Sequence, residues 1–210
     1  MLKQKVIKTL KKYNLSHVGS CLSCVDIVEQ IFKHKKEDDL FILSKGHAAV
    51  TLYCQIMDDP DMTKLSEHPD RNVKLGIPHT TGSLGHGLPL SVGHAWVGTR
   101  THVLVSDGEL DEGSNWEAIR FVGEKGLGKV RLYVDLNGFQ AYKATNTNSV
   151  IADKFRSFGW ACMMLNGHNK DPLERAVKMD TEKTPLAVIC RTTKHMNDNK
   201  PSFESHYKKL

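Results

Sequence analysis

Two apolar runs, each followed at once by a polar loop that contains glycine, constrain the fold of this chain more than any other feature. The run 101–105 leads into Ser-Asp-Gly-Glu-Leu-Asp-Glu-Gly at 106–113, and the run 130–136 leads into Asn-Gly-Phe-Gln at 137–140. Each run has the length and the β-branched content of a buried strand, and a helix-like segment lies between them. This order predicts two parallel strands whose carboxyl ends, with their loops, meet at one edge of a sheet.

Strand-like and helix-like segments alternate along the rest of the chain as well. Further apolar strands are predicted at 40–43, 160–165 and 186–190. Helices are predicted over 1–12, 23–32, 48–56, 88–96, 114–122 and 150–158 and onward from 171, with Ser23, Ser114 and Asp171 as amino-terminal caps, while 58–81 is rich in loops. This order predicts an α/β fold with a mostly parallel sheet and helices on both faces, in which ligands bind at the carboxyl ends of the strands.

Length and composition set the remaining bounds. A chain of 210 residues is most simply one domain, and we expect residues 191–210 to form a flexible tail because they lack periodicity. The formal net charge is +5, but lysines near the two ends, such as Lys11 and Lys194, lack the motifs of a nucleic-acid site, and we interpret them as solvated surface. Without an apolar run long enough for a membrane span or a signal-peptide core, a cytoplasmic protein is expected.

The five cysteines are scattered and odd in number, which argues against a disulfide framework. Cys21 and Cys24 form a C-x-x-C pair, but a zinc or redox site would need a second pair or a thioredoxin-like setting. We interpret this segment as small residues that pack at a turn before a helix.

The two loop tips carry the chemistry of a hard-cation site. Asp107 and Asn137 are thirty positions apart and each follows a predicted strand, so a carboxylate, a side-chain amide and the carbonyl of Phe139 could converge. Mg²⁺ takes about six oxygens, often one or two carboxylates together with phosphates and water. Taken alone, Asp107-Gly108 is also a common turn and Asn137-Gly138 a common hairpin, although no matching strand follows the latter.

Glycine and histidine positions add weaker signals. Gly108 would let a phosphate group approach the backbone closely, and the turn 82–87 precedes a helix, where exposed N–H groups can bind anions. The chain has 11 histidines, so a single one means little by itself.

Four further segments stand in a revealing order: Ser-His-Val-Gly-Ser-Cys-Leu-Ser at 16–23, Phe-Ile-Leu-Ser-Lys-Gly-His-Ala-Ala at 41–49, Glu-His-Pro-Asp-Arg at 67–71 and Thr-Gly-Ser-Leu-Gly-His-Gly at 81–87. Together with the two loops they resemble the transketolase family, and more closely the separate N-terminal subunit of a split transketolase. The resemblance runs from about Asn14 to about Gln140 and is much weaker beyond. One departure is Ser106, where the family usually has glycine.

The resemblance implies thiamine diphosphate and Mg²⁺, or Ca²⁺ or Mn²⁺, as cofactors, and it assigns roles to named residues. The implied active-site histidines are His17, His47, His68 and, with a poorer match, His206. The implied cofactor contacts are His47, His68, Gly82, Leu84, Asp107, Gly108, Glu109, Glu112 and Asn137, and the implied metal ligands are Asp107, Asn137 and Phe139.

The resemblance also implies that the chain works with a partner. In this family a glutamate on a pyrimidine-binding domain activates the cofactor, and nothing in residues 141–210 resembles that domain. We therefore expect a separate pyrimidine-binding C-terminal subunit, in an assembly of two copies of each chain, and transfer of a two-carbon ketol unit between sugars or sugar phosphates.

Three alternatives stay open. The chain could be a degenerate, non-catalytic half that binds or regulates a thiamine-diphosphate enzyme, or a subunit that resembles deoxyxylulose-phosphate synthase. A generic nucleotide-binding α/β domain is the third, but it would want a G-x-G-x-x-G after its first strand, which this chain lacks.

Overall fold

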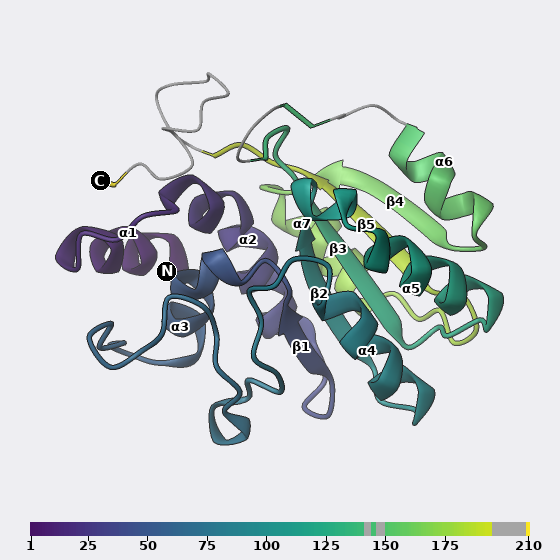
Figure 1. Cartoon of the computed structure of the whole chain (residues 1–210), viewed down its shortest axis with the longest axis horizontal. Helices are drawn as coiled ribbons and strands as arrows, with labels where there is room; N and C mark the ends of the chain where they lie inside the picture. The colour runs from purple at the N-terminus through teal and green to yellow at the C-terminus, as the bar shows by residue number, and fades with distance from the viewer. Residues whose placement is uncertain (141–143, 146–149, 195–208) are drawn as a thin grey trace.

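Five parallel strands form one sheet in the computed structural model, which describes residues 1–140, 144–145, 150–194 and 209–210 (Figure 1). The strands are β1 (Leu40–Leu43), β2 (Thr101–Ser106), β3 (Val130–Leu136), β4 (Ala161–Asn166) and β5 (Leu186–Arg191). Their spatial order is β1-β2-β3-β5-β4, so β5 pairs with both β3 and β4. The predicted parallel α/β sheet is confirmed.

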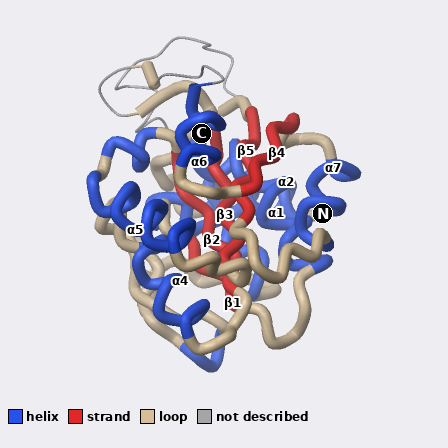
Figure 2. The backbone as a smooth tube through the Cα atoms, turned by 90° about the vertical axis from the view of Figure 1, so that its right-hand side faces the viewer, coloured by secondary structure: helices blue, strands red, loops and turns tan. Residues whose placement is uncertain are grey.

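Helices cover both faces of this sheet, as predicted. One face carries α1 (Leu2–Lys12), α2 (Val18–His34), α3 (Ala49–Ile56) and α7 (Lys170–Lys178), and the other carries α4 (Gly87–Trp96), α5 (Gly113–Glu124) and α6 (Val150–Ser157). Figure 2 shows the strands between these two layers, with α4, α5 and α6 on one side and α1, α2 and α7 on the other.

The central strands alternate their side chains between two apolar cores. Leu104 and Tyr133 pack on the α2 side, whereas Val103, Val105 and Val134 pack on the α5 side. All of β2 and β3 is buried, because a parallel strand with helices on both faces exposes neither side. This explains why both runs are almost continuously apolar in the sequence.

The predicted start of the second helix is wrong. α2 begins at Val18, just after His17 in a left-handed conformation (φ 61°), so Cys21-Leu22-Ser23-Cys24 lies inside the helix and not at a turn before it. The Ser23 hydroxyl is buried, and it donates to Asp135 Oδ2 at 2.6 Å. The Ser23 hydroxyl, which the sequence pattern predicts as a helix cap, therefore binds a residue of β3 instead.

Two other predicted caps are wrong for related reasons. α5 begins at Gly113, and the Ser114 hydroxyl donates to the carbonyl of Gly85 at 2.9 Å instead of capping the helix. α7 begins at Lys170, where the Asn169 side chain accepts from the amide of Asp171 at 3.3 Å, so the cap is Asn169 and Asp171 lies in the first turn.

The chain just after β5 stays hydrogen-bonded to the end of β3. Thr192 N donates to the carbonyl of Leu136 at 3.1 Å, and Thr193 N donates to His168 Nε2 at 3.0 Å. The first residues of the predicted tail are thus held against the sheet, while 195–208 lie outside the described residues. Within the described part of the chain, no helix is long and apolar enough to cross a membrane.

Candidate functional site

Asp107 and the loop after β3 meet at the carboxyl edge of the sheet. The register pairs Ser106 with Asp135, so the loops after β2 and β3 begin side by side. Asp107 is buried, and its Oδ2 accepts hydrogen bonds from Gly138 N at 2.7 Å and Thr145 Oγ1 at 2.5 Å. Its Oδ1 accepts from Gly108 N at 3.0 Å. The structure therefore brings together the two loop tips that the sequence places thirty positions apart.

The oxygens that gather here suit a divalent cation. Burial raises the pKa of the Asp107 carboxyl to about 6, with a smaller contribution from the Asp135 carboxylate, so a nearby positive charge would favour the ionised form. Asn137 is buried beside it, and Phe139 follows. Among the described residues no group of three or more His, Cys, Asp or Glu could hold a metal, so an ion here would depend on one carboxylate with amide, carbonyl and added phosphate oxygens.

A cavity of about 200 Å³ opens between these loops and the glycine-rich turn. Leu84, with 38% of its surface exposed, projects from that turn into the lining. Asp107 itself lines the neighbouring hollow of about 230 Å³, and the two spaces share Asp111. Six of the residues predicted for the site line the first cavity: His47, Leu84, Gly108, Glu112, Asn137 and Phe139.

Glycine is required where the two loops touch. A Cβ on Gly108 would lie 2.6 Å from the Cβ of Gln140, which real side chains do not tolerate. Gly138 has a φ of 87°, a left-handed conformation that glycine adopts without strain. The backbone of the first loop therefore lies directly against the second, and it stays accessible to a ligand.

Three of the four predicted histidines lie together beside this cavity. The rings of His17 and His47 have their centroids 5.5 Å apart. The ring of His68 packs on Gly82, where an added Cβ would lie 2.7 Å from His68 Cδ2. Burial, and then the nearby His68, lowers the pKa of His17. The fourth, His206, lies outside the described residues.

Glu109 holds the glycine-rich turn in place through buried hydrogen bonds. Its side chain is fully buried, and its Oε1 accepts from Gly85 N at 2.9 Å and from the Ser44 hydroxyl, while Oε2 accepts from Ser106 N at 3.3 Å. Burial raises the pKa of this carboxyl. In this structure its carboxylate binds protein groups of β2, the turn and the segment just after β1, whereas Glu112 is exposed at the rim of the cavity.

Ser106 fits into the same arrangement without blocking it. Its hydroxyl accepts from Glu109 N at 3.3 Å, so the side chain is used by the short 3-10 helix that follows Asp107. The departure from glycine at this position thus has a structural partner.

Sequence reasoning missed a buried ion pair beneath the site. Lys45 Nζ contacts Asp135 Oδ2 and donates to the carbonyl of Ser20 at 3.1 Å, and both charged side chains are fully buried. Burial by itself would lower the pKa of Lys45, but the attraction of the Asp135 carboxylate raises it above its usual value. The signal that could have found the pair is a charge of each sign at the end of an apolar strand.

Lys194 was also misread, because the sequence pattern places it on a solvated surface. It is half-buried, its stem lies against Gly19, and its Nζ is 5.4 Å from the centroid of the Phe139 ring. Burial, and then the nearby Lys45, lowers its pKa, while the Asp107 carboxylate opposes that shift. Nothing in the sequence pattern of a lysine-rich end marks this position, yet the structure puts a cation beside the metal-ligand candidates, where it suits an anionic ligand.

Known proteins are similar to this chain in sequence. Residues 2–206 match the family described as transketolase, thiamine diphosphate binding domain. The chain is 30% identical to the 6-deoxy-6-sulfo-D-fructose transketolase subunit SqwG of a Clostridium species, over 92% of this chain and 82% of the relative. It is 28% identical to one of the apulose-4-phosphate transketolase subunits of Phocaeicola vulgatus, over 91% and 80%.

Full-length transketolases are matched over a smaller share. The crystal structure of transketolase from Campylobacter jejuni superposes with a TM-score of 0.77 at 23% identity, covering 91% of this chain but 36% of that one. Transketolase-like protein 2 of Bos taurus is 30% identical and is covered over 34% of its length. The chain therefore spans about a third of these proteins and about four fifths of the relatives named as subunits.

Proposed function

This chain belongs to the transketolase thiamine diphosphate-binding domain family, and on that premise we propose that it binds thiamine diphosphate with Mg²⁺ as one subunit of an enzyme that transfers two-carbon ketol units between sugars. The observation that carries the proposal is the contact of the Asp107 carboxylate with Gly138, beside a cavity lined by Gly108 and Asn137. A diphosphate with a divalent cation matches this mixture of oxygens, close backbone and nearby cation.

The loop residues hold the cofactor in this proposal. The Asp107 carboxylate, the Asn137 amide oxygen and the Phe139 carbonyl bind Mg²⁺, or Ca²⁺ or Mn²⁺ in its place, and the diphosphate supplies further oxygens. Lys194 balances the charge of the diphosphate, and Gly108 lets it approach the backbone. Leu84 and Glu112 line the cavity where the cofactor rings would lie, and Gly82 belongs to the same turn as Leu84.

The histidines handle the sugar. When bound, thiamine diphosphate supplies the carbon nucleophile and the electron sink for breaking a carbon–carbon bond of a ketose. His47 lines the cavity, with His17 against its ring and His68 against Gly82, and we propose that the sugar stands beside these three histidines. They hold its hydroxyls and move protons to and from its oxygens, and the lowered pKa of His17 suits a neutral imidazole that accepts a proton. His206 takes the same role as a further prediction.

A partner subunit completes the enzyme in this proposal. Two of the most similar relatives are named as transketolase subunits. We infer a pyrimidine-binding C-terminal subunit that covers the exposed Leu84 and Glu112, in a cytoplasmic assembly with two copies of each chain and a sugar or sugar-phosphate substrate. A deoxyxylulose-phosphate-synthase-like reaction is the alternative for the same site.

Calorimetry with thiamine diphosphate and Mg²⁺ tests the cofactor site. We expect the chain to bind both together, and Asp107→Asn to weaken binding at least about tenfold, because a charged oxygen ligand contributes about 1.5–3 kcal/mol. Asp153→Asn, which changes an exposed carboxylate on α6 paired with Arg156, is the matched control and keeps wild-type affinity. Equal affinity in the wild type and in Asp107→Asn would refute the site.

Activity with and without a partner tests the subunit role. We expect the purified chain alone to transfer no two-carbon unit, and the chain reconstituted with its pyrimidine-binding subunit to do so. Measurable transfer by the single chain contradicts the need for a partner. Cofactor binding without activity in the reconstituted complex would support the non-catalytic alternative.

A further inference from the structure

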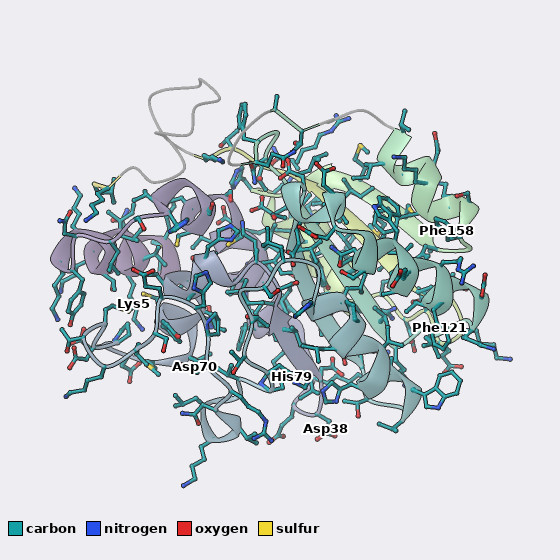
Figure 3. The ribbon with its side chains drawn as sticks, viewed as in Figure 1. Lys5, Asp38, Asp70, His79, Phe121 and Phe158 are labelled. Carbon is teal, nitrogen blue, oxygen red and sulfur yellow. The ribbon has the colours of Figure 1, made fainter. Side chains whose placement is uncertain are left out.

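Two histidines that do not line the cofactor cavity face each other across a short gap. The Nε2 atoms of His79 and His94 lie 2.7 Å apart, and the ring centroids are 5.0 Å apart with the planes at 55°. His79 (labelled in Figure 3) lies on the segment that enters the glycine-rich turn, and His94 lies on α4, which leaves it. We propose that this pair is a second metal site, which binds one late divalent transition ion such as Zn²⁺ through the two imidazole nitrogens and water.

The geometry of the pair fits such an ion with a small adjustment. A separation of 2.7 Å is one hydrogen bond, in which one ring nitrogen donates and the other offers a lone pair. Zn–N bonds of about 2.0–2.1 Å in a tetrahedral site put two ligand nitrogens roughly 3.3 Å apart. The rings therefore need to separate by about 0.6 Å, which side-chain rotation can supply. Imidazole nitrogens favour Zn²⁺, Cu²⁺ or Ni²⁺ over the Mg²⁺ of the oxygen site.

For both Nε2 atoms to bind the ion, the ring that donates the hydrogen bond must move its proton to Nδ1, which a neutral imidazole does by changing its tautomer. Both rings are partly buried, and burial, followed by the nearby His94 and Arg71, lowers the pKa of His79. Arg71 opposes a bound cation, but it is exposed and therefore screened by solvent. Among the described residues no third His, Cys, Asp or Glu joins the pair as a metal ligand. Two coordination positions thus go to water, which makes the ion exchangeable, unlike a closed structural zinc.

The position of the pair would let a bound ion restrain the glycine-rich turn. His79 and His94 are 15 residues apart, and the turn 82–87 lies between them. The segment before the turn is already fixed, because Thr81 donates through its hydroxyl to the carbonyl of Leu43 at 2.7 Å and through its amide to that of Pro69 at 3.0 Å. An ion across the pair would bind this segment to α4 and so restrain both ends of the turn.

Zinc calorimetry on the untagged chain in excess Mg²⁺ tests the site, with the Mg²⁺ occupying oxygen ligands. We expect one Zn²⁺ per chain, and at least about a tenfold loss of affinity in His79→Gln and in His94→Gln, because each removes one of only two protein ligands. His86→Gln, an exposed histidine of the same turn, is the control and keeps wild-type affinity. With Co²⁺ as the probe, the visible absorption of a tetrahedral ion should appear in the wild type and disappear in both variants.

Two measurements guard against misfolding, one on the wild type and one on the variants. Zn²⁺ should slow hydrogen exchange of the wild type in residues 79–94, and the circular dichroism of the zinc-free variants should match that of the wild type. The proposal is overturned if both glutamine variants bind Zn²⁺ as the wild type does, if the affinity falls only in His17→Gln or His47→Gln, or if protection appears elsewhere. None of these readouts depends on thiamine diphosphate, so the site can fail or stand separately from the proposed function.

Discussion

Gly108 shows, at the scale of one residue, how tightly the two loops of the candidate site are joined. Because an added Cβ would lie 2.6 Å from Gln140 Cβ, Gly108→Ala must push the loop after β3 away from Asp107. Overpacking of this kind costs about 1–3 kcal/mol, so we expect cofactor affinity to fall about fivefold to about a hundredfold. Calorimetry with thiamine diphosphate and Mg²⁺ measures the change.

A second substitution separates a steric effect from any other. Gln140→Gly removes the atom that collides, so Gly108→Ala should cost much less in that background than in the wild type. Gly93→Ala is the matched control, since nothing lies within 4 Å of its added methyl group and the exposed helix should gain about 0.5–1 kcal/mol. Equal losses in both backgrounds would show that the contact with Gln140 does not explain the glycine.

The sequence predicts the spatial neighbours of some residues of the site and not those of others. Asp107 and Asn137 could be placed together because each directly follows an apolar run, and parallel strands share an edge. Lys45 and Lys194 could not, because their burial depends on partners in other elements of the chain. A local pattern records which side chain is charged but not which distant group neutralises it.

At the scale of elements, the Lys45–Asp135 pair joins the ends of β1 and β3 beneath the candidate site. Asp135 also accepts from the hydroxyls of Ser23 on α2 and Thr192 after β5, so four segments meet at one carboxylate. This places the pair directly before the two segments that carry His47 and Asn137. The precision of those loops should therefore depend on a charge that touches no ligand.

Breaking one half of this pair should cost more than removing both charges. Lys45→Met leaves a buried carboxylate without its cation, and we expect a loss of about 3–5 kcal/mol in the free energy of unfolding. Lys45→Met combined with Asp135→Asn removes both charges, and the amide can still accept from one of the Ser23 and Thr192 hydroxyls and donate to the oxygen of the other, so most of that loss should return. Urea unfolding of both variants measures the difference, and additive losses would contradict a coupled ion pair.

Strands were easier to predict than helix starts for the same physical reason. The apolar runs of β2 and β3 reflect burial on both faces, which is a property of the whole segment and survives small local exceptions. A cap depends on one hydroxyl, and the hydroxyls of Ser23 and Ser114 both donate hydrogen bonds to groups in other segments instead. Only the structure shows which of two hydrogen-bond partners a serine takes.

For the whole molecule, the polar groups of the sheet lie in two regions, one that forms the candidate site and one that is buried and structural. The carboxyl edge carries the candidate site, whereas His102, near the start of β2, lies in a buried chain of hydrogen bonds. Its Nδ1 is 3.1 Å from the Tyr133 hydroxyl and its Nε2 is 3.2 Å from Asp39 Oδ2. With the Tyr133 hydroxyl as donor to Nδ1, Nε2–H donates to the carboxylate, and a neutral ring satisfies both contacts.

The contribution of His102 to global stability should therefore fall as the solution is acidified through the histidine range. Burial lowers the pKa of His102 in the folded protein, despite the opposing contact with Asp39, so the unfolded chain takes up its proton first. Stability from the neutral ring is complete above about pH 6.5 and declines below it, with a slope of at most about 1.4 kcal/mol per pH unit for one group. The pKa values of His17 and His79 are also lowered and act in the same direction, whereas the lowered pKa of Asp39 acts only at more acidic pH. The raised pKa values of Asp107 and Glu109 act in the opposite direction, because these carboxyls bind protons in the folded protein at a higher pH than in the unfolded chain.

The comparison with His102→Gln isolates the buried ring from these other groups. His102→Gln should be less stable than the wild type at pH 7, and urea unfolding between pH 7 and pH 5 should show this difference in free energy decreasing as the pH falls. A difference that stays constant or grows toward pH 5 would mean that the buried ring gains its proton at no cost, which its surroundings do not allow.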